Sequence, residues 1–271
     1  MPKLVGALRV KNEELFLERT IEQACSYIDE LAILDDFSTD KTIEIISRIC
    51  YKCSTPYRII YSPDKRYHEG RDRDLLLNLV HEMNADWCIQ IDADEVYERN
   101  FADSVKKYMS MNIDVVWIGV CQMWSVDEKP WYDVTTFRTN NGWSTSFYHD
   151  GIGIQHNRPA LFRIYESQRK SGSARDHGYL CPIELHDSNK CLYPLQIFAH
   201  FGYATPSLIK KKCERHGNIP PVTKEELEGT DYGLDYNPEN WNPTEAIKAF
   251  EKEWLQVDNV DLKELNRKIW L

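Results

Sequence analysis

The sequence has no run that approaches the roughly 18 consecutive apolar residues that a membrane-spanning helix needs. Its first residues, MPKLVGALRVKNEELF, lack the apolar core of a signal peptide. Positive charge is not in surplus either, because 43 acidic residues outnumber 33 basic ones and the formal net charge is −10. An acidic chain gains no general attraction to nucleic acid from counterion release, which disfavours a DNA- or RNA-binding role. We therefore expect a soluble, cytoplasmic protein without a transmembrane segment.

A zinc-finger pattern of cysteines is also missing. Cys50 and Cys53 form one C-x-x-C pair among eight cysteines, but no second C-x-x-C or H-x-x-x-H follows at the spacing of a zinc site. The pair is expected where a helix passes into a loop, rather than directly after a strand. We therefore expect these cysteines to be reduced thiols with structural roles.

The sequence does contain ample apolar material, 42% of 271 residues, in a regular alternation of short apolar runs and amphipathic segments. The runs predict strands at 4–10, 30–36, 57–62 and 87–91. Helices are expected between and after them, at about 13–28, 41–49, 70–83 and 101–111. This order predicts an α/β fold with a parallel, doubly wound sheet, in which ligands bind beyond the carboxyl ends of the strands.

The ends of two helices can be placed from capping residues. Asn12 can cap the first helix, and Thr39 or Asp40 the second. Helical spacing puts five side chains on one apolar face of the first helix, namely Leu15, Ile21, Ala24, Cys25 and Ile28.

Three acidic side chains, Asp92, Asp94 and Glu95, follow the fourth strand in the segment WCIQIDADEVY. If strand geometry persists, the two-residue alternation points the carboxylates of Asp92 and Asp94 the same way. Close carboxylates repel unless a cation joins them or one is protonated. Carboxylate oxygens suit Mg²⁺ or Mn²⁺, which also bind the phosphates of a substrate, whereas the alternative is a solvated turn that caps the next helix. Glu95 faces the other way and is expected to be a helix or loop partner.

LAILDDFSTDKT, followed about fifty residues later by WCIQIDADE, resembles the family 2 glycosyltransferases, which carry V-D-D-x-S-x-D-x-T after the second strand and D-x-D after the fourth. The segments ALRVKNEELFLERTIE and GRDRDLLL are similar to other parts of that family, so the resemblance covers residues 4–100. It implies a GT-A fold: a Rossmann-like, mostly parallel central sheet with flanking helices. The sequence departs from the family pattern at Phe37, where glycine is common, and at Asp74, where asparagine is frequent.

The resemblance implies how the first acidic pair would bind a nucleotide-sugar donor. Asp35 and Asp36 would hold the nucleoside, because a carboxylate accepts from the uracil N3–H or from ribose hydroxyls. Arg73, or alternatively Arg71, would support the base or the phosphates. Asp40 is expected to cap a helix.

The same resemblance implies a metal centre. Asp92 would contact ribose or metal-bound water, and Asp94 would ligate Mn²⁺ or Mg²⁺ directly, so that the ion neutralises the leaving nucleotide diphosphate. His200, in FAHFGY, is the candidate third ligand, and a packed core histidine is the alternative.

An inverting transferase also needs a base that deprotonates the acceptor hydroxyl. RPALFRIY followed by CPIELHD resembles the family segment that carries this base, which makes Asp187 the first candidate, with Asp150 and Glu184 as reserves. All three can instead be surface acids. The aromatic stretch 124–148 is either an acceptor platform or a packed subdomain.

These patterns predict a GT-A domain over 1–203, with a nucleotide-sugar-binding half at 1–110 and an acceptor-binding half at 111–203, followed by a helical extension at 204–271. The expected function is metal-dependent transfer of a sugar from a nucleotide-sugar, UDP-linked in our interpretation, to a glycan, protein, small-molecule or modified-nucleobase acceptor. The alternatives are a sugar-nucleotide nucleotidyltransferase and a non-catalytic nucleotide-sugar binder. Only Gly6 stands where the first of these needs a glycine-rich phosphate loop.

Overall fold

The computed structural model describes residues 2–203 except for short gaps at 66–67, 98–100, 127–128, 135–136, 140–141, 145–146, 150–151, 155–156, 168–169, 172–178, 187, 193 and 195–196. The chain forms two compact units. The first contains Met1–Val96, Phe101–Trp117 and Arg158–Pro194, and the second contains Tyr97–Asn100, Ile118–Asn157 and Leu195–Leu271. The helical extension expected over 204–271 lies outside the described residues, so it and the expected division at residues 110 and 203 stay predictions.

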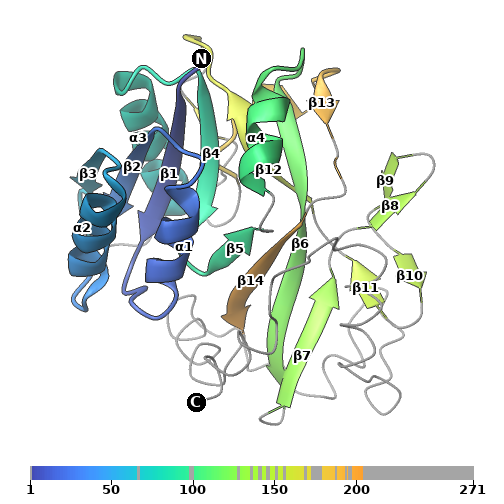
Figure 1. Cartoon of the computed structure of the whole chain (residues 1–271), viewed down its shortest axis with the longest axis horizontal. Helices are drawn as coiled ribbons and strands as arrows, with labels where there is room; N and C mark the ends of the chain where they lie inside the picture. Colours follow the sequence, from blue (N-terminus) through green and yellow to red (C-terminus); the bar gives the residue numbers. More distant parts are fainter. Residues whose placement is uncertain are drawn as a thin grey trace. The chain divides into compact units, whose positions relative to one another are not determined.

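Four parallel strands form the centre of the first unit (Figure 1). They are β1 (Leu4–Val10), β2 (Glu30–Asp35), β3 (Tyr57–Tyr61) and β4 (Trp87–Asp92), in the order β3-β2-β1-β4. Nearly every residue of β1, β2 and β4 is buried, which explains why these strands read as continuous apolar runs rather than as alternating ones. Beyond β4 the sheet continues with β12 (Asn157–Arg163), which is antiparallel to it.

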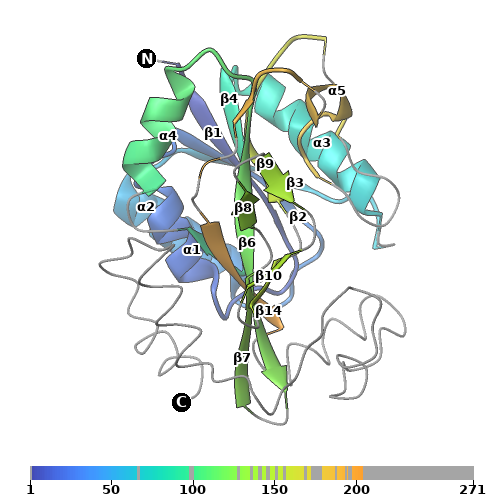
Figure 2. The ribbon, with the colours of Figure 1, turned by 90° about the vertical axis from the view of Figure 1, so that its right-hand side faces the viewer.

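Helices cover both faces of these strands. The helices are α1 (Leu17–Ala24), α2 (Thr42–Cys53), α3 (Glu69–Glu82), α4 (Phe101–Met109) and the short α5 (Ile183–His186). Figure 2 shows α3 on one face of the sheet and α1 and α2 on the other. The predicted α/β class with a mostly parallel central sheet and flanking helices is therefore confirmed for the part of the chain that the structure describes.

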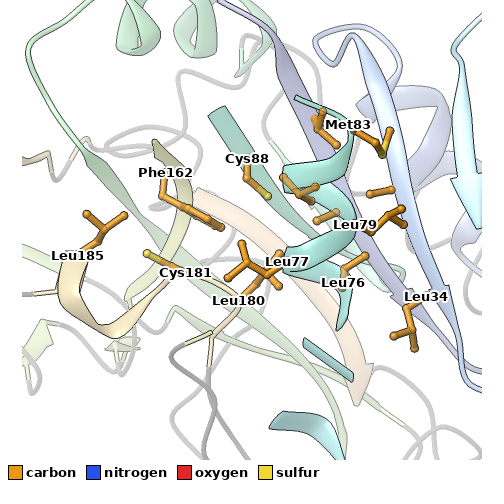
Figure 3. Packing of buried hydrophobic residues seen from close by; sticks show 14 of the residues in the cluster. Leu34, Leu76, Leu77, Leu79, Met83, Cys88, Phe162, Leu180, Cys181 and Leu185 are labelled. Atoms are coloured by element: carbon orange, nitrogen blue, oxygen red, sulfur yellow. The ribbon is translucent and has the colours of Figure 1, made fainter. Parts of the chain in front are cut away.

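The hydrophobic core beneath α3 joins residues that are far apart in the sequence. Figure 3 shows Leu76, Leu77 and Leu79 of α3 gathered with side chains from β2, β4 and β12. Phe162 of β12 lies opposite Cys88 of β4 in the strand register, and both are fully buried. The segment that contains β12 is thus fixed to the first unit by core packing.

The first helix is shorter than its apolar pattern predicts. It begins at Leu17, and Leu15 is 62% exposed, so placing Leu15 on the buried face was wrong. The expected cap was also wrong, because Asn12 adopts a left-handed backbone conformation with φ 54° and lies ahead of the helix. Asparagine tolerates this conformation better than most residues, which makes it a loop residue here.

The loop after β1 is tied to the loop after β2 by hydrogen bonds that run in both directions. The side chain of Asn12 accepts from the amide of Thr39 at 2.7 Å, and the amide of Asn12 donates to the hydroxyl of Ser38 at 3.0 Å. The amide of Glu13 donates to the hydroxyl of Thr42 at 2.8 Å. These contacts hold the residues before α1 in a non-helical loop, which is why the helix starts late.

Several strands of the second unit fall within the aromatic stretch 124–148. Here β6 (Val115–Val126), which begins in the first unit, pairs with β7 (Lys129–Val134) as an antiparallel hairpin. Two small hairpins follow, and β14 (Ile197–Tyr203) pairs with β6 in parallel. The strands of the two small hairpins are β8 (Phe137–Thr139), β9 (Gly142–Ser144), β10 (Phe147–His149) and β11 (Ile152–Ile154). Of the remaining strands, β5 (Glu95–Tyr97) begins in the first unit and β13 (Cys191–Leu192) lies in it.

Six cysteines of the described part, among them Cys50 and Cys53, are free thiols. The C-x-x-C pair lies in the last turn of α2, which ends at Cys53, so it is at the end of a helix as expected. In the described ranges no helix combines the length and apolar character that crossing a bilayer requires.

We predict that Leu77→Ala lowers the free energy of unfolding by about 2–5 kcal/mol, because it leaves a cavity in the core beneath α3. The same substitution at Leu15, which is 62% exposed, should change the stability by less than about 0.5 kcal/mol. Urea unfolding followed by circular dichroism measures both. Equal losses in the two variants would contradict this assignment of the core.

Candidate active site

The two acidic motifs that follow β2 and β4, at 35–36 and 92–95, lie at one edge of the sheet in the first unit. In the register of the parallel strands, Val10 of β1 lies opposite Asp35 of β2, and Arg9 of β1 lies opposite Asp92 of β4. The carboxyl ends of these three strands therefore meet at the same edge, as expected for an open α/β sheet. The expectation that both acidic motifs follow strand ends at that edge is met.

Asp35 and Asp36 play different structural parts. Both carboxylate oxygens of Asp35 accept from the amide of Ser38 at 3.2 Å, so Asp35 stabilises the turn that follows β2. Phe37 in this turn has φ 59°, a left-handed conformation that favours glycine. This conformation explains why the family commonly has glycine at this position, and it makes phenylalanine an unusual residue here.

Asp36 is fully buried and forms ion pairs with two cationic side chains. Its Oδ2 atom accepts from Arg9 and from Lys11, each at 3.1 Å. Its Oδ1 atom is buried and has no hydrogen-bond partner among the described residues. A buried acceptor without a donor is costly, so Oδ1 is an acceptor that a ligand N–H or O–H can satisfy.

The ion pair of Asp36 is part of a larger buried network. Arg9 also donates to Oδ2 of Asp72 at 3.0 Å, and Asp72 is fully buried in the first turn of α3. The other oxygen of Asp72 accepts from Arg71 at 2.8 Å and from the hydroxyl of Ser62 at 3.1 Å. Alternating charges thus link α3 to the ends of β1 and β2.

Arg71 and Arg73, the two candidates for supporting the base or the phosphates of the donor, have different surroundings. Arg71 joins this network and also contacts Asp64 at 3.0 Å, whereas Arg73 pairs with Glu69 one helical turn away at 2.6 Å. Arg71 is therefore connected to Asp36 through Asp72 and Arg9. The nucleotide-binding roles of both arginines stay predictions.

The D-x-D segment does not continue the strand. β4 ends at Asp92, and Ala93 and Asp94 form a turn, so strand alternation does not align the two carboxylates as the sequence had suggested. The hydroxyl of Thr20 in α1 donates to the carbonyl of Ala93 at 2.8 Å and lies 3.1 Å from that of Glu95. The turn is thereby fixed to α1, and Asp92 and Asp94 both remain partly exposed.

A buried arginine supplies positive charge to this acidic segment. Arg158, on β12, is 5% exposed and donates to Oδ2 of Asp92 at 2.6 Å. It also donates to both carboxylate oxygens of Glu95. Gln90 supports the arrangement, because its carbonyl accepts from Arg158 at 3.4 Å and its side chain accepts from the amide of Leu180 at 2.9 Å.

Glu95 is buried at 4% exposure, and its partner is this arginine. The pKa of Glu95 is raised well above its ordinary value, mainly by burial; the Arg158 guanidinium lowers it, and the nearby carboxylates of Asp92 and Asp94 raise it. Both Glu95 oxygens accept from Arg158. Glu95 was expected to face away from the other acids and to pair with a helix or loop; its partner is instead an arginine on β12, which it shares with Asp92.

The candidate third metal ligand and the candidate bases are not part of this acidic edge in the described residues. His200 is partly buried on β14, in the second unit, opposite Gln122 of β6 in the strand register. Asp150 and Asp187, the candidate bases, lie outside the described residues, and the reserve Glu184 is exposed in α5. Where the chain is described, no three His, Cys, Asp or Glu side chains gather into a group that could hold a metal ion.

Sequence reasoning missed Arg158, Arg9 and Asp72. Arg9 and Asp72 stand inside segments that resemble the family, and a charged residue within a buried strand is a usable signal of a buried partner. Arg158 is 66 residues from Asp92 and gives no local signal of its partner.

Comparison with known proteins identifies related sequences. The family model described as glycosyl transferase family 2 matches residues 8–168. An uncharacterized glycosyltransferase of Rickettsia felis is 27% identical over 106 residues, which are 39% of this chain and 34% of that protein. The chain therefore spans about a third of the length of this curated relative.

Two solved structures illustrate the structural similarities. Staphylococcus aureus TarS 1–349 in complex with UDP-GlcNAc is 14% identical with a TM-score of 0.48, over 99% of this chain and 78% of that one. Glucosyl-3-phosphoglycerate synthase from Mycobacterium tuberculosis, in complex with Mn²⁺ and UDP-glucose, is 20% identical with a TM-score of 0.33, over 44% of each chain. The family assignment rests on the sequence match.

We predict that Asp72→Asn lowers the free energy of unfolding by about 3–5 kcal/mol, because it removes the charge that Arg9 and Arg71 share in a buried site. Asp64→Asn removes a partner of the same Arg71 where the carboxylate is 38% exposed, and should cost less than about 1 kcal/mol. Urea unfolding curves of both variants test this. A small loss at Asp72 would show that the network contributes little.

Proposed function

The chain belongs to glycosyl transferase family 2, and on this basis we propose that it transfers a sugar from a UDP-linked donor to an acceptor hydroxyl, with Mn²⁺ or Mg²⁺, inverting the configuration of the transferred sugar. The observation that carries the proposal is the pairing of two features at one sheet edge: the buried, unsatisfied Oδ1 of Asp36 and the partly exposed carboxylates of Asp92 and Asp94. The first suits a nucleoside, and the second suits a cation that also binds phosphate.

The nucleoside end of the donor would be held by Asp36. Its Oδ1 atom can accept from the uracil N3–H, while Arg9 and Lys11 fix the carboxylate through Oδ2. Asp35, whose oxygens hold the turn through Ser38, can still accept from a ribose hydroxyl because a carboxylate has about four acceptor sites. Arg71 or Arg73 would support the base or the phosphates.

The diphosphate end would lie against Asp92 and Asp94. One or two carboxylates together with substrate phosphates form the usual ligand set of Mg²⁺, so these residues fit the ion without a third protein ligand, and His200 is an additional candidate. When bound, the ion would neutralise the charge that grows on the departing diphosphate. The chain's own contribution is to hold both carboxylates at the edge through Arg158 and Thr20.

The acceptor side of the proposal rests on the resemblance. Asp187, with Asp150 in reserve, would take the proton from the acceptor hydroxyl, and residues 124–148 would bind the acceptor. We propose a glycan, a protein, a small molecule or a modified nucleobase as the acceptor, and the cytoplasm as the location of the enzyme.

A thermal-shift screen of nucleotide-sugars with and without Mn²⁺ tests the donor class. Donor binding without turnover would favour a non-catalytic relative instead.

We predict that Asp94→Asn abolishes Mn²⁺-dependent UDP binding, a loss of at least about 100-fold in affinity, because a direct ligand is removed. Isothermal titration calorimetry measures the affinity, and thermal unfolding checks that the variant folds. Asp103→Asn, at an exposed position in α4, is the matched control and should bind UDP normally. Unchanged affinity in Asp94→Asn would rule out the assignment of this metal ligand.

We predict that Asp187→Asn lowers turnover by about 100- to 10,000-fold and leaves donor affinity unchanged, because it removes only the base. Glu184→Gln, at the exposed reserve position, should keep normal turnover. Steady-state kinetics and UDP titration separate the two effects. Near-normal turnover in Asp187→Asn would move the base elsewhere or indicate a retaining reaction.

A further inference from the structure

Three cysteines lie where two neighbouring helices of the first unit end. Cys25 directly follows α1, and Cys50 and Cys53 lie in the last turn of α2. The two helices pack side by side (Figure 1). We call Cys25, Cys50 and Cys53 the cysteine trio.

Two surface ion pairs show how these helices are aligned. Glu18 of α1 pairs with Arg48 of α2 at 2.7 Å. One turn later, Glu22 pairs with Lys52 at 2.6 Å. Each pair joins residues 30 positions apart, so α1 and α2 run in the same direction. The same offset brings Cys25 level with the end of α2.

The side chain of Cys25 is the common partner of the trio. Its thiol makes hydrogen bonds with the thiols of Cys50 and Cys53 and with the hydroxyl of Thr55. Thr55 is held at the end of α2 by a turn, in which Ser54 has a left-handed φ of 56° and the amide of Thr55 donates to the carbonyl of Cys50 at 3.0 Å. Side chains from two helices and one turn thus converge on a single sulfur atom.

The members of the trio differ in burial. Cys50 is 1% exposed, whereas Cys25 and Cys53 are partly exposed, so a reagent in solution can reach Cys25 but not Cys50. The hydrogen bond with Cys50, opposed by burial and aided by those with Thr55 and Cys53, lowers the pKa of the Cys25 thiol to about 6, while Glu22 raises it. The thiolate is the reactive form of cysteine, which makes Cys25 the reactive member.

The trio lies at the edge of the sheet opposite to the acidic motifs. The amide of Asp29, which follows α1, donates to the carbonyl of Leu4 at 2.9 Å. The amide of Leu31 donates to the carbonyl of Pro56, which follows α2, also at 2.9 Å. Both helices therefore end near the amino ends of β1 and β2, whereas the acids follow carboxyl ends. Chemistry at the trio is separate from donor binding.

We propose that Cys25 is a site of oxidation by peroxide, and that it then forms a disulfide bond with Cys50. First, the Cys25 thiolate attacks a peroxide oxygen, so that an S–O bond forms, the O–O bond breaks, and the departing hydroxide takes up a proton. The Cys50 sulfur then attacks the Cys25 sulfur, so that the S–S bond forms, the S–O bond breaks, and hydroxide leaves with the Cys50 proton as water. Two thiols are oxidised, and hydrogen peroxide is reduced to water.

Disulfide formation fits the arrangement of the trio better between the helices than within α2. Residues three apart in a helix have Cβ atoms about 5–6 Å apart, whereas a disulfide needs about 3.5–4.5 Å. This spacing disfavours a bond between Cys50 and Cys53, while the sulfur atoms of Cys25 and Cys50 are already hydrogen-bonded neighbours. In the described ranges the trio does not form a group that could hold a metal ion.

The main test is a peptide map of the full chain after treatment with a small excess of hydrogen peroxide. Mass spectrometry without reductant should find two peptides joined through Cys25 and Cys50, and a reductant should separate them. Cys25→Ser should lose this disulfide. Cys53→Ser and Cys191→Ser, which remove a partly exposed thiol inside and outside the trio, are the matched controls and should keep it. Thermal unfolding shows whether each variant folds, and the map of the unmodified protein needs no variant.

A second measurement follows the reactivity of the reduced protein. At pH 6, iodoacetamide should alkylate Cys25 about tenfold faster than Cys191, because about half of Cys25 is then thiolate, while an ordinary thiol is less than about 1% ionised. The lower basicity of the Cys25 thiolate offsets only part of this advantage. Mass spectrometry of each cysteine peptide over time gives both rates.

Three results overturn the inference: a map in which Cys25 stays reduced, a disulfide that joins Cys25 to Cys53 in place of Cys50, or alkylation of Cys25 that is no faster than that of Cys191. None of these results bears on sugar transfer, because the trio is distant from the acidic motifs along the strands. Failure of the proposed function would likewise leave the oxidation of Cys25 unaffected.

Discussion

The structure of the first unit depends on neutralising carboxylates where parallel strands end. A parallel sheet brings the ends of β1, β2 and β4 to one edge, and the acids that follow β2 and β4 are buried or half-buried there. Desolvated carboxylates are tolerated only with partners. Arg9 meets this need for Asp36, and Arg158 meets it for Glu95 and Asp92. Each arginine comes from a strand next to the acid that it serves.

This arrangement divides the acids into two groups. Asp72 and Glu95 are almost inaccessible and have arginine partners on both oxygens, so Asp72 holds α3 to the sheet through Arg9 of β1, and Glu95 holds Arg158 of β12. Asp92 and Asp94 retain exposed surface, and Asp36 retains one buried oxygen without a donor in the described part of the chain. The same edge therefore combines acids that stabilise the fold with acids that remain able to bind a ligand.

Much of the first unit could be predicted from the sequence because its signals are local. The apolar runs that became β1, β2 and β4 are buried on both faces, and the acids at their ends are read directly from the order of residues. The start of α1 could not be predicted, since it is decided by hydrogen bonds to a loop about 26 residues away. The partner of Glu95 could not be predicted either, because only the pairing of β12 with β4 brings Arg158 there.

The hydrogen bonds between the loops after β1 and β2 have a consequence for exchanging parts with relatives. The side-chain oxygen of Asn12 accepts from the amide of Thr39, and the hydroxyls of Ser38 and Thr42 accept from the amides of Asn12 and Glu13, so replacing the side chains of either segment removes hydrogen bonds between them. The segments KNEE and STDKT therefore form one structural unit, although about two dozen residues separate them in the chain. A chimera that receives both segments together preserves the N-terminal ends of α1 and α2, whereas a chimera that receives one segment alone disturbs the N-terminal ends of both helices.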